Sequence, residues 1–470
     1  MARRRDERLG LYQMALVLCI VFALGVHLGL HLVAAPHETN RSPREKAKKM
    51  RQVFEPPPPA GEAMAARQPE PTKARTSEAR DPVQPPPEMT TTTTTTRRGP
   101  FAAYLATGRR LPIVLLACDR PEALRNTLVS LLRGAAASDV AVVQDGADEA
   151  VAAVAREFGL VVERNNGRPR DRDGAARIAR NYKYALGWAL EQHFVDAPGV
   201  IVVEDDLLFS PDFLNFMETV GPIVDEDESV LVVSAWNDNG FFEDQNPRKL
   251  LRTHYFPGLG WLLPRRLWVE ELKPKWPKTH WDHWLRDPAQ HRGRECVFPA
   301  VPRSFHAGAK GTFMDSWHHA RYFSPIKYNL DASIRWREVD AKLATRDVYE
   351  ADLRARFQRA HHVATFADLD AKATATAKDT PIVFWYSWKP HDGNDHHPPN
   401  FVCVSEVFRL WHERKRAEHH GTHEAVYKAH SVILVNAQDS KYARHFKPPA
   451  LVPLQPPDCP PRTWRDLGRD

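Results

Sequence analysis

The sequence predicts an α/β fold built on a mostly parallel sheet, and two observations carry this prediction. Between residues 112 and 203, short apolar runs suited to buried strands alternate with segments whose apolar residues have helical spacing. Several of the apolar runs end in clusters of polar or acidic residues. Strand–helix alternation is typical of parallel sheets covered by helices, and such sheets bind ligands at the carboxyl ends of their strands.

The predicted elements follow one another without long gaps. The apolar runs that predict strands lie at residues 112–117, 140–143, 160–162 and 200–203. The helical segments between them lie at residues 122–132, 148–158 and 175–194. Two later apolar runs, at residues 381–386 and 431–435, predict strands of a smaller C-terminal lobe. We therefore expect a main domain over residues 109–346 and the lobe over residues 347–470.

An apolar run at residues 11–35 predicts a transmembrane helix, because about 25 residues can span the ~30 Å hydrocarbon core of a bilayer. Four arginines precede the run, which places residues 1–10 in the cytoplasm and the rest of the chain on the lumenal side. A cleaved signal peptide is the alternative, but its apolar region is usually only ~7–15 residues long. We expect a single-pass type II membrane protein.

Residues 36–108 predict a disordered stem between the membrane and the folded part. They contain two proline runs and the threonine run at residues 90–96, and few of them are apolar. Such a composition cannot bury enough apolar surface to fold. Asn40 begins an N-glycosylation sequon on the expected lumenal side.

The distribution of charge argues against binding of nucleic acid. Residues 1–110 carry 18 of the 65 Lys and Arg residues but only 10 of the 59 Asp and Glu residues. The formal charge of +6 therefore belongs to the N-terminal segment, and the folded part is close to neutral. A nucleic-acid-binding domain needs a basic face. Five cysteines in 470 residues are too few for a disulfide-built scaffold, and no CxxC or Cys/His spacing suggests a zinc site.

Three consecutive carboxylates, Glu204, Asp205 and Asp206, follow the fourth predicted strand. Their mutual repulsion is costly unless a cation offsets it. Mg²⁺ and Mn²⁺ prefer oxygen ligands, and they bind through one or two carboxylates together with substrate phosphates. This arrangement suits a nucleotide-sugar diphosphate, whose leaving group needs its charge neutralised. The alternative is a solvated acidic turn without a ligand.

Five strings further along the chain share their order with one known enzyme family. They are VVSAWNDNG at 232–240, FPGLGW at 256–261, KWPK at 275–278, WDHWLR at 281–286 and RGREC at 292–296. Together they resemble glycosyltransferases of the N-acetylglucosaminyltransferase I family, and the resemblance runs from about residue 112 to residue 456. That family includes the N-glycan enzyme and the protein O-mannose β-1,2-N-acetylglucosaminyltransferase.

The resemblance implies a GT-A fold, dependence on Mn²⁺ and an inverting transfer of N-acetylglucosamine from UDP-GlcNAc to a mannose of a glycoprotein. It also implies a Golgi membrane location, which agrees with the expected anchor and stem. The acceptor is expected to be the α-1,3-mannose arm of an N-glycan. Two segments, residues 303–306 and 401–457, look more like the O-mannose enzyme, so transfer to O-linked mannose stays open.

The same resemblance assigns the residues of a donor site. Asp206 is expected to be the direct metal ligand, with Glu204 and Asp205 at the sugar and the ribose. Asp145 is expected to hold the uracil, and Arg120 is expected to lie near the nucleotide.

The resemblance also implies that Asp282 is the general base, a role that suits the chemistry because an inverting transfer needs a carboxylate beside the attacking hydroxyl. Trp281 and Trp284 flank it, and their apolar bulk is expected to strengthen it as a base by partial desolvation. The alternative is that Asp282 caps a helix that begins at His283.

The resemblance also assigns a sugar pocket and a closing loop. Trp281 and Leu259 are expected to shape the N-acetylglucosamine pocket, among tryptophans that suit a sugar-stacking cleft. The loop at residues 308–315 is expected to fold over the diphosphate. Lys310 is a candidate phosphate contact, and Thr312 lies in the same loop at a position where the N-glycan enzyme differs.

Three positions depart from the family pattern. Asn181 stands where the family has a histidine near the uracil, and its amide can still form a hydrogen bond. Val232 stands where the family has a cysteine that pairs with the one matching Cys296. Gly146 stands where the N-glycan enzyme has a partner for Cys118. We therefore predict that Cys118 and Cys296 are free thiols.

Other interpretations stay open at this point. A transferase that uses another UDP-sugar is compatible with Asn181, and a catalytically silent sugar-binding scaffold could keep the same fold. Asp206 and Asp282 are both present, which favours an active enzyme. A histidine cluster at residues 391–397 could bind a metal ion, but a polar surface loop is the simpler interpretation.

Overall fold

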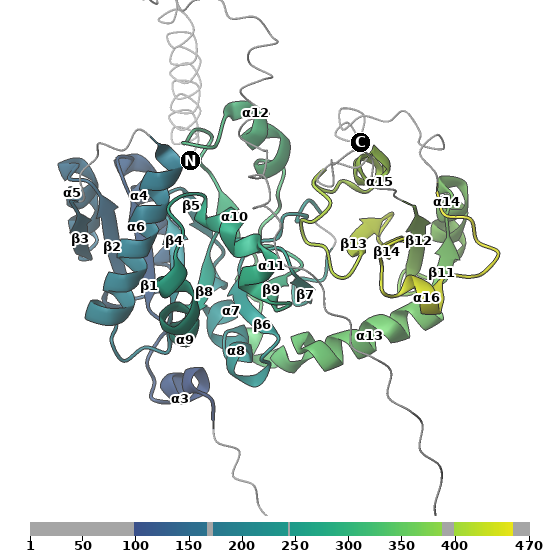
Figure 1. Cartoon of the computed structure of the whole chain (residues 1–470), viewed down its shortest axis with the longest axis horizontal. Helices are drawn as coiled ribbons and strands as arrows, with labels where there is room; N and C mark the ends of the chain where they lie inside the picture. Colours follow the sequence, from purple (N-terminus) through teal and green to yellow (C-terminus); the bar gives the residue numbers. More distant parts are fainter. Residues whose placement is uncertain (1–97, 167–172, 243–244, 388–398, 455–470) are drawn as a thin grey trace, which may run out of the picture. The chain divides into compact units, whose positions relative to one another are not determined.

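The computed structural model describes residues 98–166, 173–242, 245–387 and 399–454 (Figure 1). The predicted anchor, most of the predicted stem and the histidine cluster at residues 391–397 lie outside these ranges. Within the described part of the chain, no helix combines the length and the apolar character that crossing a bilayer requires.

The main sheet confirms the predicted α/β class. Its strands are β1 Ile113–Ala117, β2 Val140–Asp145, β3 Val161–Asn165, β4 Gly199–Glu204, β6 Val230–Ser234, β7 Leu250–Thr253, β8 Trp261–Pro264 and β9 Glu295–Pro299. They lie in the order β3-β2-β1-β4-β8-β6-β9-β7. β8 and β7 are antiparallel to their neighbours, and the other strands run in one direction. The four predicted strands are β1 to β4.

Helices cover both faces of this sheet. They include α3 Pro100–Ala106, α4 Pro121–Leu131, α5 Glu149–Glu157, α6 Gly174–Trp188, α7 Phe213–Val220, α8 Ile223–Glu226, α9 Arg265–Leu267, α10 Trp281–Arg286 and α11 Pro288–His291. A further short helix, α12 Ser316–His318, has no buried residue. A π-helical turn, Ala189–His193, extends α6, so the helix predicted at residues 175–194 is confirmed.

The burial of β1 shows why its sequence reads as a continuous apolar run. Ile113 and Leu115 belong to one apolar cluster with Leu124 of α4, whereas Val114 and Leu116 belong to a second cluster with helix α6. Successive side chains of a strand point to opposite faces. A strand covered by helices on both sides therefore needs apolar residues at every position.

The folded part begins earlier than the boundary expected at residue 109. Helix α3 lies inside the range expected as the stem, and Phe101 is only 1 % exposed. Its backbone N–H donates to Asp225 Oδ2 over 2.8 Å. The stem prediction is wrong for these residues. It was based on the proline and threonine content of the whole segment and overlooked the short apolar stretch at residues 101–105.

A second sheet lies in the C-terminal part and has the order β11-β12-β14-β13. Its strands are β11 His361–Val363, β12 Ile382–Tyr386, β13 Thr422–Tyr427 and β14 His430–Asn436. The helices around it are α13 Arg346–Arg359, α14 Phe366–Ala375, α15 Pro399–Phe408 and α16 Ala443–Phe446. The two strands predicted in this region are β12 and β14. A short antiparallel pair, β5 Leu207–Phe209 and β10 Ser304–His306, completes the strands near the first sheet.

Candidate active site

The predicted donor-site residues meet at one edge of the main sheet. Strands β2, β1 and β4 are adjacent and parallel, so their carboxyl ends lie side by side. Arg120 follows β1, Asp145 ends β2, and Glu204 ends β4 (Figure 1). Asp205 and Asp206 form the turn between β4 and β5. We call Arg120, Glu204, Asp205 and Asp206 the active-site edge.

One arginine bridges two of the three carboxylates. Arg120 Nη1 donates to Asp206 Oδ2 over 2.8 Å, and its Nη2 pairs with Asp205 Oδ1. The backbone N–H of Cys118 donates to the other oxygen of Asp205 over 3.4 Å. Asp205 and Asp206 are 1 % and 9 % exposed. A single guanidinium therefore faces two buried carboxylates, and a third, Glu204, lies beside them.

Cations at this edge do not compensate the buried negative charge. Burial raises the pKa of Glu204 to about 7, and the neighbouring charge of Asp206 adds to the effect. Burial also raises the pKa of Asp205 to about 6, although Arg120 opposes this shift. Such raised values indicate an environment that lacks positive charge, which is a common property of functional sites.

Two buried atoms at the edge lack partners among the described residues. Asp206 Oδ1 and His306 Nδ1 are both buried without a hydrogen bond. His306 Nε2 lies 3.6 Å from Asp206 Oδ2. A buried unsatisfied polar atom costs about 1–3 kcal/mol, and more when it is charged. Asp206 and His306 therefore fit a divalent cation, which accepts both carboxylate and imidazole ligands.

His306 was not predicted to be a metal ligand. The antiparallel pair β5–β10 places His306 opposite Leu207, the residue after Asp206. His306 and Asp206 are 100 positions apart in the chain. No local spacing rule connects them, so only knowledge of the strand pairing could have identified His306.

Tyr182 is the second residue that the sequence analysis missed. Its hydroxyl donates to Glu204 Oε1 over 2.6 Å, and its ring stacks on Trp281 with centroids 4.1 Å apart. Burial raises the pKa of Tyr182, and Glu204, Asp282 and Asp206 raise it further. Tyr182 therefore connects Glu204 of the active-site edge with Trp281, the residue before Asp282.

Asp282 lies in the first turn of α10, whose N-cap is His280. The alternative that Asp282 caps a helix beginning at His283 is therefore wrong. Arg286 Nη1 donates to Asp282 Oδ2 over 2.8 Å, and the Asp282 side chain is 36 % exposed. The carboxylate is thus accessible and is held by a residue one turn further along the same helix.

The expected strengthening of Asp282 as a base is also wrong. Burial does raise the pKa of Asp282, but Arg286, His283 and backbone N–H groups lower it more, and the net pKa lies below the usual value. The apolar bulk of Trp281 is outweighed because a cation and the helix N-terminus stabilise the ionised form. Asp282 is consequently ionised at neutral pH.

The neighbouring tryptophans are mainly core residues, which corrects the expectation of a sugar-stacking cleft. Trp261, Trp276 and Trp281 are 1 %, 8 % and 7 % exposed and belong to the apolar cluster beneath α6. Trp276 and Trp281 stack with centroids 5.7 Å apart. Trp281 therefore has little surface left for a sugar, whereas Trp284 is half-buried.

Leu259 has a strained backbone beside the site. Its φ angle is 51°, and the flanking Gly258 and Gly260 have φ angles of 69° and 91°. The backbone oxygen of Leu259 accepts a hydrogen bond from Ser304 Oγ over 2.6 Å. A left-handed conformation at a non-glycine residue costs roughly 1–3 kcal/mol and tends to occur at functional sites.

The residues predicted for the uracil come together at the ends of β2 and β3. Asp145 pairs in register with Asn165, and Asn165 Nδ2 donates to Asn181 Oδ1 over 3.0 Å. Asn181 lies on α6 and is buried. Arg177 Nη2 lies 3.9 Å from Asp145 Oδ2. Burial raises the pKa of Asp145, against the lowering effect of Arg177.

The predicted closing loop, residues 308–315, begins directly against Asp206. A Cβ atom on Gly308 would lie 2.5 Å from Asp206 Oδ2, so a larger residue there would require Asp206 to move. Further along the loop, Thr312 lies against Gly174 at the start of α6. The ring of Phe313 lies 5.8 Å from that of His280, next to α10. The loop therefore extends from the acidic edge to the helix that carries Asp282.

Lys310 and Thr312 are both exposed on this loop. Lys310 therefore lies in the segment that borders Asp206 at one end and α10 at the other. The phosphate contact expected of Lys310 stays a prediction.

The predicted state of two cysteines is confirmed. Cys118 and Cys296 are free thiols. Burial raises the pKa of Cys118 to about 11, with the nearby carboxylate of Asp119 as the next cause. Cys403 is disulfide-bonded.

Known proteins resemble this chain in sequence and, weakly, in structure. The sequence profile of the GNT-I family matches residues 91–385. An alpha-1,3-mannosyl-glycoprotein 2-beta-N-acetylglucosaminyltransferase of Arabidopsis thaliana is 34 % identical over 265 residues, which cover 53 % of this chain and 58 % of that protein. The match thus spans less than two thirds of that curated relative.

Two solved structures are weakly similar. Glucosyl-3-phosphoglycerate synthase from Mycobacterium tuberculosis, in complex with Mn²⁺, UDP and phosphoglyceric acid, has a TM-score of 0.24 and 16 % identity, over 37 % of this chain and 61 % of that one. A cytidylyltransferase from Leptospira borgpetersenii has a TM-score of 0.24 and 11 % identity, over 38 % and 72 %. TM-scores of 0.24 support no conclusion about this chain. The sequence profile covers more than half of the chain, and the chain belongs to the GNT-I family.

Proposed function

We propose that this protein is a glycosyltransferase that moves N-acetylglucosamine from UDP-GlcNAc, with inversion, in β-1,2 linkage to a mannose of a glycoprotein. The observation that carries the proposal is the active-site edge, where buried carboxylates exceed the cations that face them. Membership of the GNT-I family and the name of the Arabidopsis thaliana relative support the reaction. A GT-A arrangement of the main sheet is part of the proposal.

A divalent cation, Mn²⁺ in this proposal, would be held by Asp206 and His306. Such an ion, when bound, neutralises the charge of a diphosphate leaving group. Arg120 holds Asp206 in place through its hydrogen bond. Gly308 lets the loop approach Asp206 closely, because a larger residue there would displace the Asp206 carboxylate.

Asp282 would accept the proton of the attacking mannose hydroxyl. It is ionised, accessible, and oriented by its hydrogen bond from Arg286. A carboxylate with a low pKa accepts a proton only as the new bond forms, when the acidity of the hydroxyl rises sharply. Arg286 thereby keeps Asp282 available as a base throughout the physiological pH range.

The remaining predicted residues would contact the donor. Asp145 and Asn181, which are linked through Asn165, would offer a carboxylate and an amide to the uracil. Glu204 and Asp205 would lie near the sugar and the ribose, and Lys310 near the phosphates.

The pocket for N-acetylglucosamine would include the backbone at Leu259 and an edge of Trp281. Thr312 would cover the donor as part of the loop at residues 308–315.

The proposed location is the Golgi membrane, in single-pass type II orientation, with the folded part lumenal. The predicted anchor at residues 11–35 and the sequon at Asn40 support this orientation. The disulfide at Cys403 supports an oxidising compartment. The proposed division into a catalytic domain and a C-terminal lobe follows the two sheets.

The proposed acceptor is the α-1,3-mannose arm of an N-glycan. One observation favours O-linked mannose as a second candidate. His306, in the segment that resembles the O-mannose enzyme, lies beside Asp206.

The test uses the full-length chain in detergent with UDP-GlcNAc and Mn²⁺. A five-mannose N-glycan and an O-mannosyl peptide are offered in parallel, and a chelator is added as a control. We expect product on one acceptor and loss of product with the chelator. A folded protein that binds UDP but yields no product on either acceptor would contradict this donor or acceptor. A protein that does not bind UDP would contradict the proposal as a whole.

A further inference from the structure

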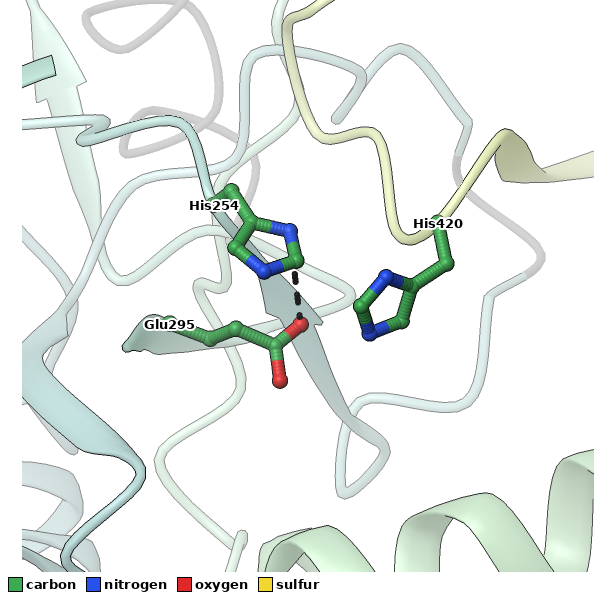
Figure 2. Close-up of side chains that lie close together, drawn as sticks. All are labelled: His254, Glu295 and His420. Atoms are coloured by element: carbon green, nitrogen blue, oxygen red, sulfur yellow. Dashed lines mark ion pairs between the residues drawn. The ribbon is translucent and has the colours of Figure 1, made fainter. Parts of the chain in front are cut away.

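Two histidines and a buried glutamate meet where the two sheets of the structure contact each other. His254 follows β7, Glu295 begins β9, and His420 lies in the turn before β13 (Figure 2). One nitrogen from each ring and one oxygen of Glu295 lie within 4.8 Å of one another. We call these residues, together with Glu350 and His419, the sheet junction. None of them belongs to the active-site edge.

Neighbouring groups fix the position of Glu295. It is fully buried, and its Oε2 accepts a hydrogen bond from Arg252 Nε over 3.0 Å. Its Oε1 contacts His419 Nδ1 at 2.6 Å and lies 3.9 Å from His254 Nδ1. A carboxylate that is oriented by outer partners is typical of metal ligands. Oε1 has a second lone pair that can face the histidine rings.

A strained turn presents His420 to the same space. The backbone N–H of Thr422 donates to the oxygen of His419, which closes a tight turn. His420 and Gly421 at its centre have φ angles of 49° and 79°. The positive φ at Gly421 is free of side-chain strain, but at a histidine it costs free energy. Strain of this kind is maintained where the side chain has a task.

The rings of His254 and His420 have unused nitrogen atoms. Neither ring makes a hydrogen bond of 3.5 Å or less with any other described residue. The two rings pack edge to face, with their centroids 4.7 Å apart. Their side chains are 31 % and 28 % exposed, so an ion from solvent can reach them. A ring–ring contact explains their proximity but leaves the nitrogen atoms unpaired.

His419 does not compete for the same role. Its Nδ1 contacts Glu295 at 2.6 Å, and its Nε2 contacts Glu350 Oε1 at 2.9 Å and the Tyr442 hydroxyl at 3.1 Å. Both nitrogen atoms are engaged, which leaves none for a metal ion. The grouping of His254, Glu295 and His420 is therefore favoured over the one that uses His419.

We propose that His254, Glu295 and His420 bind a divalent transition-metal ion, and that Zn²⁺ is the preferred ion. Two imidazoles and one carboxylate suit Zn²⁺, and water would complete the coordination. Zinc–ligand bonds are about 2.0–2.2 Å long, so the half-buried rings of His254 and His420 would have to move toward Glu295 when the ion binds. The ion would link β7 and β9 of the main sheet to the turn that precedes β13 of the second sheet. This proposal does not rest on the proposed function.

The test is a titration of the full-length chain in detergent with Co²⁺, followed by displacement with Zn²⁺. Co²⁺ held by imidazoles in four or five coordination absorbs visible light strongly, whereas octahedral Co²⁺ with oxygen ligands absorbs weakly. The variants are His254→Ala, His420→Ala and the double variant. His361→Ala is the matched control, because His361 is a half-buried histidine on the second sheet outside the junction. Asp206→Ala removes the proposed catalytic site.

We expect a visible absorption band in the unaltered protein and its loss on addition of Zn²⁺. Each single variant should weaken Co²⁺ binding by roughly tenfold or more, and His361→Ala and Asp206→Ala should retain it. Zn²⁺ should also raise the thermal unfolding midpoint of the unaltered protein but not that of the double variant. Absence of the band from the unaltered protein, or its survival in the double variant, would overturn the proposal.

Discussion

The active-site edge and the sheet junction are both buried clusters of carboxylates, yet the pKa values of their carboxylates shift in opposite directions. Asp205 at the edge is 1 % exposed, and Glu295 at the junction is 0 % exposed. Burial raises the pKa of Asp205 to about 6. At the junction burial also opposes ionisation, but the hydrogen bond and charge of His419 and the charge of Arg252 hold the pKa of Glu295 well below its usual range.

The difference arises from the number of partners that face each carboxylate. Among the described residues, Arg120 is the one cation that pairs with Asp205 and Asp206 at the edge, whereas Arg252, His419 and Lys441 pair with Glu295 and Glu350 at the junction. Hydrogen bonds from His419 and Lys441 lower the pKa of Glu350 to about 2, against the opposing effect of burial. The comparison teaches that burial alone does not mark a ligand site, because the deficit of positive charge distinguishes the edge.

The largest expected effects lie in the proposed catalytic reaction at the edge. Asp282→Asn should lower the transfer rate by roughly 10²–10⁴-fold, because the amide cannot take up the proton. It should leave metal-dependent UDP binding unchanged. Asp206→Ala should abolish that binding, since it removes the carboxylate with the unpartnered oxygen. Each variant is the control for the other, and calorimetry with UDP and Mn²⁺ measures binding separately from turnover. Normal turnover in either variant would remove that residue from its role.

A large effect on stability is expected at the junction. Glu295→Gln leaves the fully buried Arg252 facing an uncharged amide, and loss of one member of a buried pair costs about 3–5 kcal/mol. Arg109→Met is the control, because the Arg109–Asp196 pair is mostly exposed and should contribute little. Urea unfolding of both variants measures the two changes in the free energy of unfolding. Equal changes in the free energy of unfolding would show that the buried pair at Glu295 contributes no more than the exposed pair at Arg109.

The two clusters should respond to pH with opposite signs when metal is removed. Glu204 and Asp205 have folded-state pKa values above the ordinary 4.5 and 3.8, so their ionisation destabilises the fold as pH rises toward about 7. Glu350 has a lowered pKa, so its stabilisation is present above pH 4.5 and is lost as pH falls toward about 2.

Urea unfolding in a chelator, repeated across pH, measures both responses. Glu204→Gln should become progressively more stabilising relative to the parent protein between pH 4.5 and about 7, because the variant removes a carboxylate that ionises unfavourably. Glu350→Gln should be most destabilising above pH 4.5 and less so in acid. If the free energy of unfolding of either variant differed from that of the parent by a constant amount across the pH range, the replaced carboxylate would not have a shifted pKa in the folded protein.

The smallest expected effect concerns one cysteine beside each cluster. Cys118 adjoins Asp205, and Cys296 follows Glu295 in β9. Cys118 is half-buried with a raised pKa, so a thiol reagent should label it slowly in the native protein. Cys296 is fully buried and should not react on that timescale.

Addition of Mn²⁺ and UDP should slow the labelling of Cys118 further and leave Cys296 unchanged. Mass spectrometry of labelled peptides gives both rates. Under denaturing, non-reducing conditions both thiols should react. Rapid native labelling of Cys296 would contradict its burial.

Local sequence patterns were sufficient for strands β1 to β4 of the main sheet and for the acidic edge, but not for β6, β7, β8 and β9. The apolar runs of β1 to β4 are continuous because both faces are covered, and Glu204, Asp205 and Asp206 are consecutive. His306 could not be predicted, because its position depends on the pairing of β10 with β5.

The chemical character of a predicted residue was harder to derive than its position. Asp282 lies where the family resemblance placed it, but Arg286 reverses the expected effect of the tryptophans on its pKa. The sheet junction joins residues 254, 295 and 420, whose meeting depends on how two sheets contact each other. Local periodicity contains no information about such a contact.

Tyr182 has a consequence for how this protein could change during evolution. Its hydroxyl is committed to Glu204 and its ring to Trp281, so one residue belongs to both halves of the proposed reaction centre. A lineage that replaced Glu204 to accept a different donor would leave the Tyr182 hydroxyl without its acceptor, and a smaller residue at 182 would loosen Trp281. We therefore expect these three positions to vary together among descendants, and the route to a new donor to require several coordinated substitutions.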